Sequence, residues 1–196
     1  MADLGTVEAL RNASFKDIAS ILDAQELQAL DADFSHDWPA AAHILGHLYN
    51  YDLPDARYVW KRLPDVLKQE RVVTMAFQLL QAMWNKDYQG VWQALNRQDW
   101  GAEVAPLAAA LAEKVRAYNA ELITRAYSSI APSKAAALLG LPEAQAVELA
   151  ERAGWGRRDV SSGLITVTRP AGGSDERVTS EHLARLTQYV THLEAS

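Results

Sequence analysis

Apolar residues recur at three- and four-residue spacing through the first hundred positions of this 196-residue chain. Phe15, Ile18 and Leu22 begin the pattern, and similar runs surround Ile44 and Val73. The spacing predicts one amphipathic helix after another, because residues three and four apart share a helix face. Pro and Asp residues between the runs predict helix ends near positions 37–39, 52–54, 63–64 and 86–87.

Two of these helical stretches resemble each other at a fixed offset. Residues 84–95 repeat the pattern of residues 49–60, 35 positions later: an aromatic residue, Asn, Asp, and an apolar residue that opens the next helix. The offset is close to the ~34-residue hairpin of tetratricopeptide-like repeats. Such hairpins bury their apolar faces by stacking on their neighbours. We therefore predict a helical-repeat part over residues 1–127, in which the Ala-rich segment 102–127 supplies one or two helices and Pro106 lies near a helix start.

The pattern changes after residue 127. A short helix is expected over 133–139, stopped by Gly140, and a second from Pro142 to about Ala153. Ile165 and Val167 then alternate with threonines, as in a β-strand. Helix, turn, helix and β-ribbon is the order of a winged helix, which we place at 128–170. The predicted fold is thus mainly α: helical repeats, a winged helix, a flexible joint at 171–177 and a C-terminal helix at 178–196.

That last helix carries an apolar stripe with the 3, 4, 3 spacing of a coiled-coil seam. The joint before it is rich in Gly and allows the helix to leave the winged helix. We expect partner helices to cover the stripe, with packing on the chain's own core as the alternative. An exposed strand edge in the ribbon would offer a second contact, because its N–H and C=O groups are unpaired. The candidate partner-binding residues are Leu183, Leu186, Tyr189, Val190, Leu193, Ile165 and Val167.

Composition and missing motifs argue against catalysis. The chain has no cysteine, which excludes thiol chemistry and thiolate metal sites. It also lacks G-x-S-x-G, G-x-G-x-x-G and G-x-x-x-x-G-K-[ST], so serine hydrolysis and nucleotide binding have no local signature. We predict a protein that is not an enzyme, with no cofactor, no metal and no small-molecule substrate.

Charge and apolar content indicate where such a chain works. Its 25 acidic and 19 basic residues give a net charge of −6, which has no long-range attraction for nucleic acid or anionic membranes. No signal peptide and no apolar run of ~20 residues are present. We expect no membrane association and a location in the cytoplasm and nucleus.

Two constellations leave alternatives open. His43 and His47 stand four apart, a spacing that zinc sites use, but the Glu of H-E-x-x-H is missing. Histidines packed within the helical stack are the expected reading, and a metal hydrolase is the alternative. The second helix of the winged helix would be the one that contacts base edges in a DNA-binding protein. It carries three Glu and one Arg, at positions 143, 148, 151 and 152. This negative charge favours a protein-binding winged helix, and nucleic-acid binding is the alternative.

Six tryptophans lie mostly at turns and helix ends. Such side chains usually fill cores, but tryptophan is also favoured at binding hot spots. Sequence does not separate core residues from interface anchors here.

A set of motifs carries a family resemblance. They begin with His36-Asp37-Trp38-Pro39 and end with the stretch from Arg185 to Glu194, and those between lie at 42–49, 55–61, 84–88, 99–100, 126–130, 138–140 and 154–155. Helical repeats that run into a winged helix resemble the PCI-domain family, whose members are subunits of the proteasome lid, the COP-nine signalosome and translation initiation factor three. The motifs are similar to the subunit-eight branch of the signalosome, in its green-lineage form.

The resemblance implies a role. The signalosome removes a ubiquitin-like modifier from cullin ligases, and its isopeptidase is a zinc enzyme in a different subunit. A member of this branch would contribute a winged helix to a ring of such domains and a C-terminal helix to a shared bundle, so its partners would be the other signalosome subunits. In plants the complex represses light-dependent development. A PCI subunit of the proteasome lid or of the initiation factor is the alternative within the family.

Overall fold

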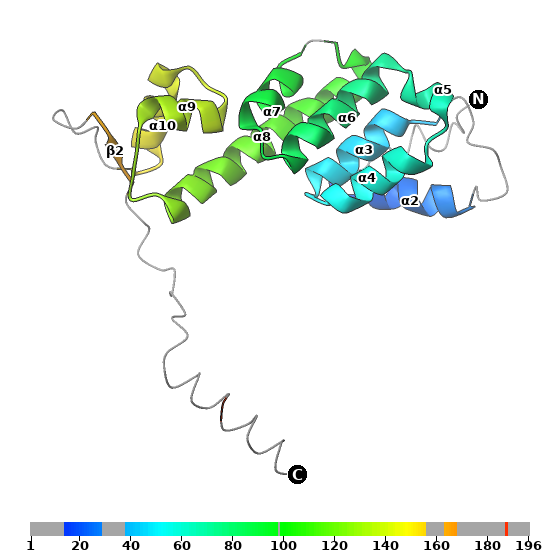
Figure 1. The fold of residues 1–196 in the computed structure, drawn as a ribbon, viewed down its shortest axis with the longest axis horizontal. Helices are drawn as coiled ribbons and strands as arrows, with labels where there is room; N and C mark the ends of the chain where they lie inside the picture. The colour runs from blue at the N-terminus through cyan, green and yellow to red at the C-terminus, as the bar shows by residue number, and fades with distance from the viewer. Residues whose placement is uncertain (1–13, 29–37, 98, 156–162, 168–186, 188–196) are drawn as a thin grey trace.

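The computed structural model describes residues 14–28, 38–97, 99–155, 163–167 and 187. These residues form a mainly helical fold, as predicted (Figure 1). The helices of the first part are α2 (Ile18–Gln28), α3 (Ala40–Tyr49), α4 (Leu53–Arg62), α5 (Asp65–Lys68), α6 (Arg71–Trp84), α7 (Tyr88–Leu95) and α8 (Gly101–Ala126). The second part contains β1 (Ser129–Ile130), α9 (Pro132–Leu139), α10 (Glu143–Arg152) and β2 (Ile165–Thr166).

The helix boundaries fall at the predicted breakers. Pro39 precedes α3, Asp52 precedes α4, and Leu63 follows α4. Asp87 precedes α7, and its carboxylate accepts a hydrogen bond from the N–H of Gly90 at 3.1 Å. This bond satisfies one of the first N–H groups of the helix, which have no partner within it.

The two turns that are related by the 35-residue offset have the same backbone conformation. Asn50 and Asn85 end α3 and α6 with φ and ψ that differ by no more than two degrees. Tyr51 and Lys86 follow with left-handed φ values of 62° and 56°. The Asp after each donates its N–H to a carbonyl five residues back, His47 or Ala82, at 3.0 and 2.9 Å. The similarity of sequence thus corresponds to one turn used twice, while the stacking of tetratricopeptide type stays a prediction.

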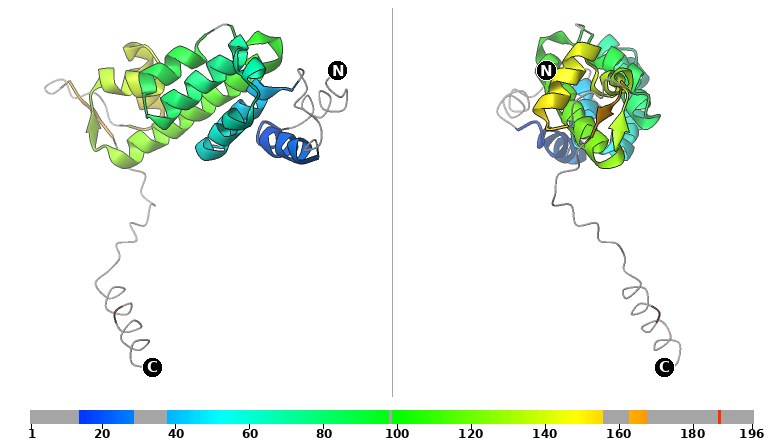
Figure 2. Two further views of the ribbon diagram at one scale, coloured as in Figure 1. Left: turned by 45° about the vertical axis from the view of Figure 1, so that its right-hand side comes forward. Right: turned by 90° about the vertical axis from the view of Figure 1, so that its left-hand side faces the viewer.

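Helix α8 is a single helix of 26 residues, and it runs along the stack and on to α9 and α10 (Figures 1 and 2). It begins at Gly101, so Pro106 lies inside it and not at its start. Proline inside a helix removes the hydrogen bond to the carbonyl four residues back, and its ring crowds that carbonyl. Pro106 and Ala102 are both exposed, so this turn of the helix faces solvent.

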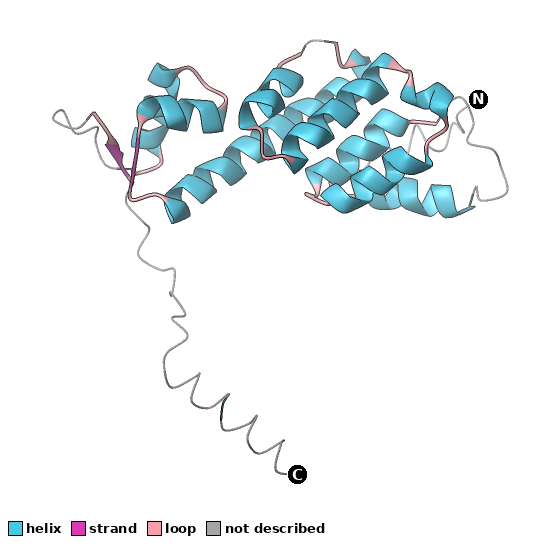
Figure 3. Cartoon of the chain, in the orientation of Figure 1, coloured by secondary structure: helices cyan, strands magenta, loops and turns pink. Residues whose placement is uncertain are grey.

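The second part begins with a strand that the sequence did not reveal. Ser129 pairs with Thr166 and Ile130 with Ile165, antiparallel, and the N–H of Val167 donates to the carbonyl of Ser128 at 2.9 Å (Figure 3). Helices α9 and α10 have the predicted ends, with Gly140 left-handed at φ 64° after α9. The complete winged helix stays a prediction, because the described part of its ribbon is confined to 163–167.

The chain forms two apolar cores. The larger one contains residues of α2 to α8, such as Leu22, Ile44 and Leu79. The smaller one contains Ile123 of α8 together with Leu139, Trp155 and other residues up to 167. Helix α8 takes part in both and therefore connects them. The joint predicted at 171–177 lies outside the described residues, as does the C-terminal helix predicted at 178–196 apart from Thr187.

Candidate functional site

The ribbon residues predicted to bind partners have buried side chains. Ile165 and Val167 are 1% and 7% exposed and belong to the smaller core. One edge of β2 is paired with β1. Within the described residues the sheet has these two strands, so a partner strand would pair with the other edge of β2 through its main chain.

The remaining candidate residues, on the terminal stripe, lie outside the described residues. They are Leu183, Leu186, Tyr189, Val190 and Leu193.

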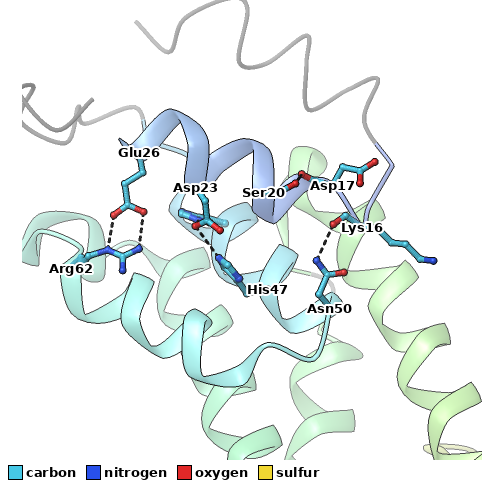
Figure 4. A network of polar contacts seen from close by, with 9 residues as sticks. Lys16, Asp17, Ser20, Asp23, Glu26, His47, Asn50 and Arg62 are labelled. Atoms are coloured by element: carbon cyan, nitrogen blue, oxygen red, sulfur yellow. Dashed lines mark hydrogen bonds and ion pairs between the residues drawn. The ribbon is translucent and has the colours of Figure 1, made fainter. Parts of the chain in front are cut away.

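The structure brings together a polar cluster that sequence showed only in part. His43 and His47 lie one turn apart on α3, and Asp23 of α2 contacts both. Figure 4 shows Asp23 facing His47. The Nε2 atoms of the two imidazoles lie 2.9 and 3.3 Å from the same oxygen, Oδ1 of Asp23. We call these three residues the Asp–His cluster.

A glycine between the two histidines allows the cluster to form. A Cβ atom at Gly46 would lie 3.0 Å from the backbone nitrogen of Ala19 and 3.1 Å from Cγ2 of Ile18. Such distances are closer than most side chains tolerate, so α2 approaches α3 closely because position 46 has no side chain. This approach brings Asp23 within reach of both rings. Sequence gave the histidine spacing, but nothing in it indicated which carboxylate faces them.

Burial and charge set the protonation of the cluster. His43 is fully buried and His47 is 4% exposed. Burial lowers the pKa of His43 below its ordinary value, against the opposing effect of the hydrogen bond with Asp23. Partial burial would by itself raise the pKa of Asp23, but the hydrogen bond from His43 and the charges of both imidazoles outweigh it, so this pKa is lowered. Burial therefore favours the neutral form of the His43 imidazole, whereas the contacts with the histidines favour the ionised form of the Asp23 carboxyl group.

Further polar contacts hold α2 against the stack. Glu26 accepts two hydrogen bonds from the guanidinium of Arg62, at 2.6 and 2.8 Å. The amide of Asn50 donates to the main-chain carbonyl of Lys16 at 2.9 Å (Figure 4). With the Asp–His cluster, these contacts fix α2 to α3 and α4.

A second feature is a set of aromatic and cationic residues on α4 and α6, which are exposed apart from the partly buried Phe77. Tyr58 and Trp84 are 55% and 47% exposed, unlike the buried Trp92, Trp100 and Trp155. The guanidinium of Arg57 lies 5.4 Å from the ring centre of Trp84, and Nζ of Lys61 lies 5.6 Å from that of Tyr58. A groove of about 330 Å³ is lined by Arg57, Phe77 and Trp84, among other residues of α6. We call Arg57, Tyr58, Lys61, Phe77 and Trp84 the aromatic surface.

The described helices include none that is both long enough and apolar enough to cross a lipid bilayer.

Comparison with known proteins agrees with this architecture. A family model described as the CSN8/PSMD8/EIF3K family matches residues 35–170. Over 196 residues the chain is 36% identical to COP9 signalosome complex subunit 8 of Arabidopsis thaliana, covering 98% of this chain and 99% of that protein. The subunit 8 of Xenopus laevis is 29% identical over 96% of this chain and 97% of its own length. That of Danio rerio is 32% identical over 76% and 78%.

The mainly helical fold, together with this family match, is consistent with a protein of the PCI type. The chain belongs to the CSN8/PSMD8/EIF3K family, as the resemblance of its motifs predicted.

Proposed function

We propose that this chain is a non-catalytic scaffold subunit of the COP9 signalosome, active in the cytoplasm and nucleus. It supports removal of the ubiquitin-like modifier from cullin subunits of ubiquitin ligases and so regulates protein degradation. In a plant this activity represses photomorphogenesis. The observation that carries the proposal is the match to proteins named subunit 8 over nearly the whole chain, with 36% identity to the Arabidopsis protein.

The aromatic surface supports a scaffold role. Large aromatic side chains such as Trp84 are costly to leave in water, and Trp, Tyr and Arg are the residues most enriched at binding hot spots. Arg57, Tyr58 and Trp84 also belong to the motifs that carry the family resemblance. We assign to this surface a contact with another subunit, in addition to the terminal stripe and the edge of β2.

A nucleic-acid-binding winged helix is the rival from another class. Helix α10 would be its reader, and the guanidinium of Arg152 donates a hydrogen bond to Glu148 of the same helix at 2.6 Å. The basic residue of that helix is thus partly neutralised, and the helix also carries Glu143 and Glu151. Titration of duplex DNA at increasing salt tests the rival: binding that falls steeply with salt would support it, because phosphate contacts release counterions.

Affinity purification of the tagged full chain, with identification of the bound proteins, tests the proposal directly. We expect the other signalosome subunits in near-equal amounts. Proteasome-lid subunits or ribosomal proteins in their place would assign the chain to another branch of the family.

A further inference from the structure

The geometry points to a divalent transition-metal site, with Zn²⁺ as its main occupant, at Asp23, His43 and His47. This inference is independent of the proposed function, since it concerns how the N-terminal helix is held. The three residues offer one ligand atom each, and these atoms lie within 4.8 Å of one another.

The spacing of the donor atoms fits a zinc shell. Zinc binds imidazole nitrogen at about 2.0–2.1 Å and carboxylate oxygen at about 2.0–2.2 Å, usually with tetrahedral geometry, which places neighbouring ligand atoms roughly 3.3–3.5 Å apart. The two Nε2 atoms lie 2.9 and 3.3 Å from Oδ1 of Asp23. Small movements of the Asp23 side chain therefore suffice to admit an ion. Two imidazoles and a carboxylate favour Zn²⁺ over Mg²⁺ or Ca²⁺, which prefer oxygen ligands.

Burial on one side and exposure on the other suit a metal ion. The side chains of His43 and His47 are 0% and 5% exposed, so their positions are fixed by packing. That of Asp23 is 42% exposed, which gives an ion access from solvent and leaves room for water as a further ligand.

Metal binding would change the hydrogen bonding of both imidazole rings. Among the described residues, the buried Nδ1 atoms of both imidazoles have no hydrogen-bond partner. When an ion takes the Nε2 lone pair, the proton of a neutral ring moves from Nε2 to Nδ1. The bonds lost at Nε2 are replaced by metal–ligand bonds. Each buried Nδ1–H is then left without an acceptor among the described residues, a desolvation cost that the metal–ligand bonds must exceed.

Such an ion would link α2 to α3, with the ligand from α2 spaced 20 residues from the nearer histidine. An ion that binds the folded chain and not the unfolded chain raises stability with its concentration. Metal would thus fix α2 more tightly to the helical stack.

The test uses the purified full chain, stripped of metal with a chelator and titrated with Zn²⁺ by calorimetry and with Co²⁺ by visible absorption. We expect one ion per chain. At a free Zn²⁺ concentration 100-fold above Kd, the melting temperature should rise by roughly 5–10 °C. Mg²⁺ at the same concentration should have no effect.

Matched variants decide the location of the ion. Asp23→Asn keeps the shape of the side chain and an oxygen that can accept a hydrogen bond, and His47→Gln keeps a polar side chain. Each substitution should weaken Zn²⁺ binding at least about tenfold. His192→Gln removes a histidine far from the cluster in sequence and should leave the affinity unchanged. No Zn²⁺ binding by the wild-type chain, equal affinity in all variants, loss in His192→Gln, or unchanged affinity in Asp23→Asn would each overturn the assignment. Circular dichroism of each metal-free variant at the titration temperature shows that it is folded, which separates a loss of Zn²⁺ affinity from a loss of the fold.

Discussion

The indole Nε1 of Trp92 on α7 donates a hydrogen bond to the main-chain carbonyl of Leu138 on α9, at 3.1 Å. The amide of Asn119 on α8 donates to the same carbonyl at 2.7 Å, and Nε of Arg116 donates to the carbonyl of Leu139 at 3.2 Å. The last carbonyls of a helix have no partner within it. Side chains of α7 and α8 supply that partner here, so the end of α9 is fixed to the helical stack.

Gly140→Ala should destabilise the chain strongly at this junction. A Cβ atom at Gly140 would lie 2.1 Å from Cδ2 of Trp92, and the backbone is left-handed with φ 64°. Overpacking costs about 1–3 kcal/mol, and a side chain on a left-handed backbone costs about 1–2 kcal/mol. We therefore expect the free energy of unfolding to fall by about 2–5 kcal/mol. Urea unfolding followed by circular dichroism measures it.

Gly101→Ala is the matched control for this prediction. Gly101 has a similar φ of 70°, but a Cβ atom there meets nothing within 4 Å. We expect only the backbone cost of about 1–2 kcal/mol. Equal losses in the two variants would show that the ring of Trp92 moves aside and that the close contact has no energetic weight.

The Asp–His cluster predicts how stability depends on pH when no metal is present. The pKa of His43 is lower in the folded chain than in the unfolded chain, mainly because of burial. As pH falls through about 6.5, the unfolded state takes up a proton first, so stability present at higher pH is lost. The lowered pKa of Asp23 adds a further loss as pH falls below about 3.8.

Urea midpoints of the wild-type chain and of His43→Gln, in chelator from about pH 7.5 to about pH 5.5, check this dependence. The urea midpoint of the wild-type chain should fall more steeply as pH decreases. The variant lacks the buried His43 imidazole, which takes up a proton more readily in the unfolded chain. Parallel slopes would contradict the assignment of this loss to His43.

Sequence predicted the helices well because their signals are local. Proline and aspartate mark the boundaries of α3, α4 and α7, and the apolar spacing marks the buried faces. Gly140 was predicted as a helix stop from its position alone. Contacts between distant segments were not predictable in this way. The pairing of Ser129 with Thr166 and the approach of Asp23 to the histidines depend on how helices pack, and no local pattern encodes it.

The sorting of the tryptophans shows the same limit. Trp60 stacks on Phe77 with ring centres 4.0 Å apart, Trp92 is buried at the junction, and Trp84 is exposed. Their burial depends on which helix packs against each of them.

Trp84→Ala tests the aromatic surface as a subunit contact. Because Trp84 is 47% exposed, its loss should change the free energy of unfolding by less than about 1 kcal/mol. If it is a hot spot, the variant should bind the other signalosome subunits at least about 30-fold more weakly, corresponding to about 2 kcal/mol. Val66→Ala, at a valine 55% exposed on α5, is the control and should bind as the wild type does. Equal binding by all three chains would remove this surface from the account.

The terminal stripe has its own test in the combined variant Leu186→Asp and Val190→Asp. Charges on a coiled-coil seam prevent the partner helices from packing, so the chain should be released from its complex. If partners cover the stripe, the helical content and the melting temperature of the isolated chain should stay nearly unchanged. Unfolding of the isolated variant would show that the stripe packs on the chain's own core.

The central claim is that this chain works as one subunit of a larger assembly. Size-exclusion chromatography of a native cell extract, with detection of the untagged wild-type chain, tests it most directly. We expect elution at high mass together with the other signalosome subunits. Elution as a 196-residue monomer, free of other subunits, would contradict it.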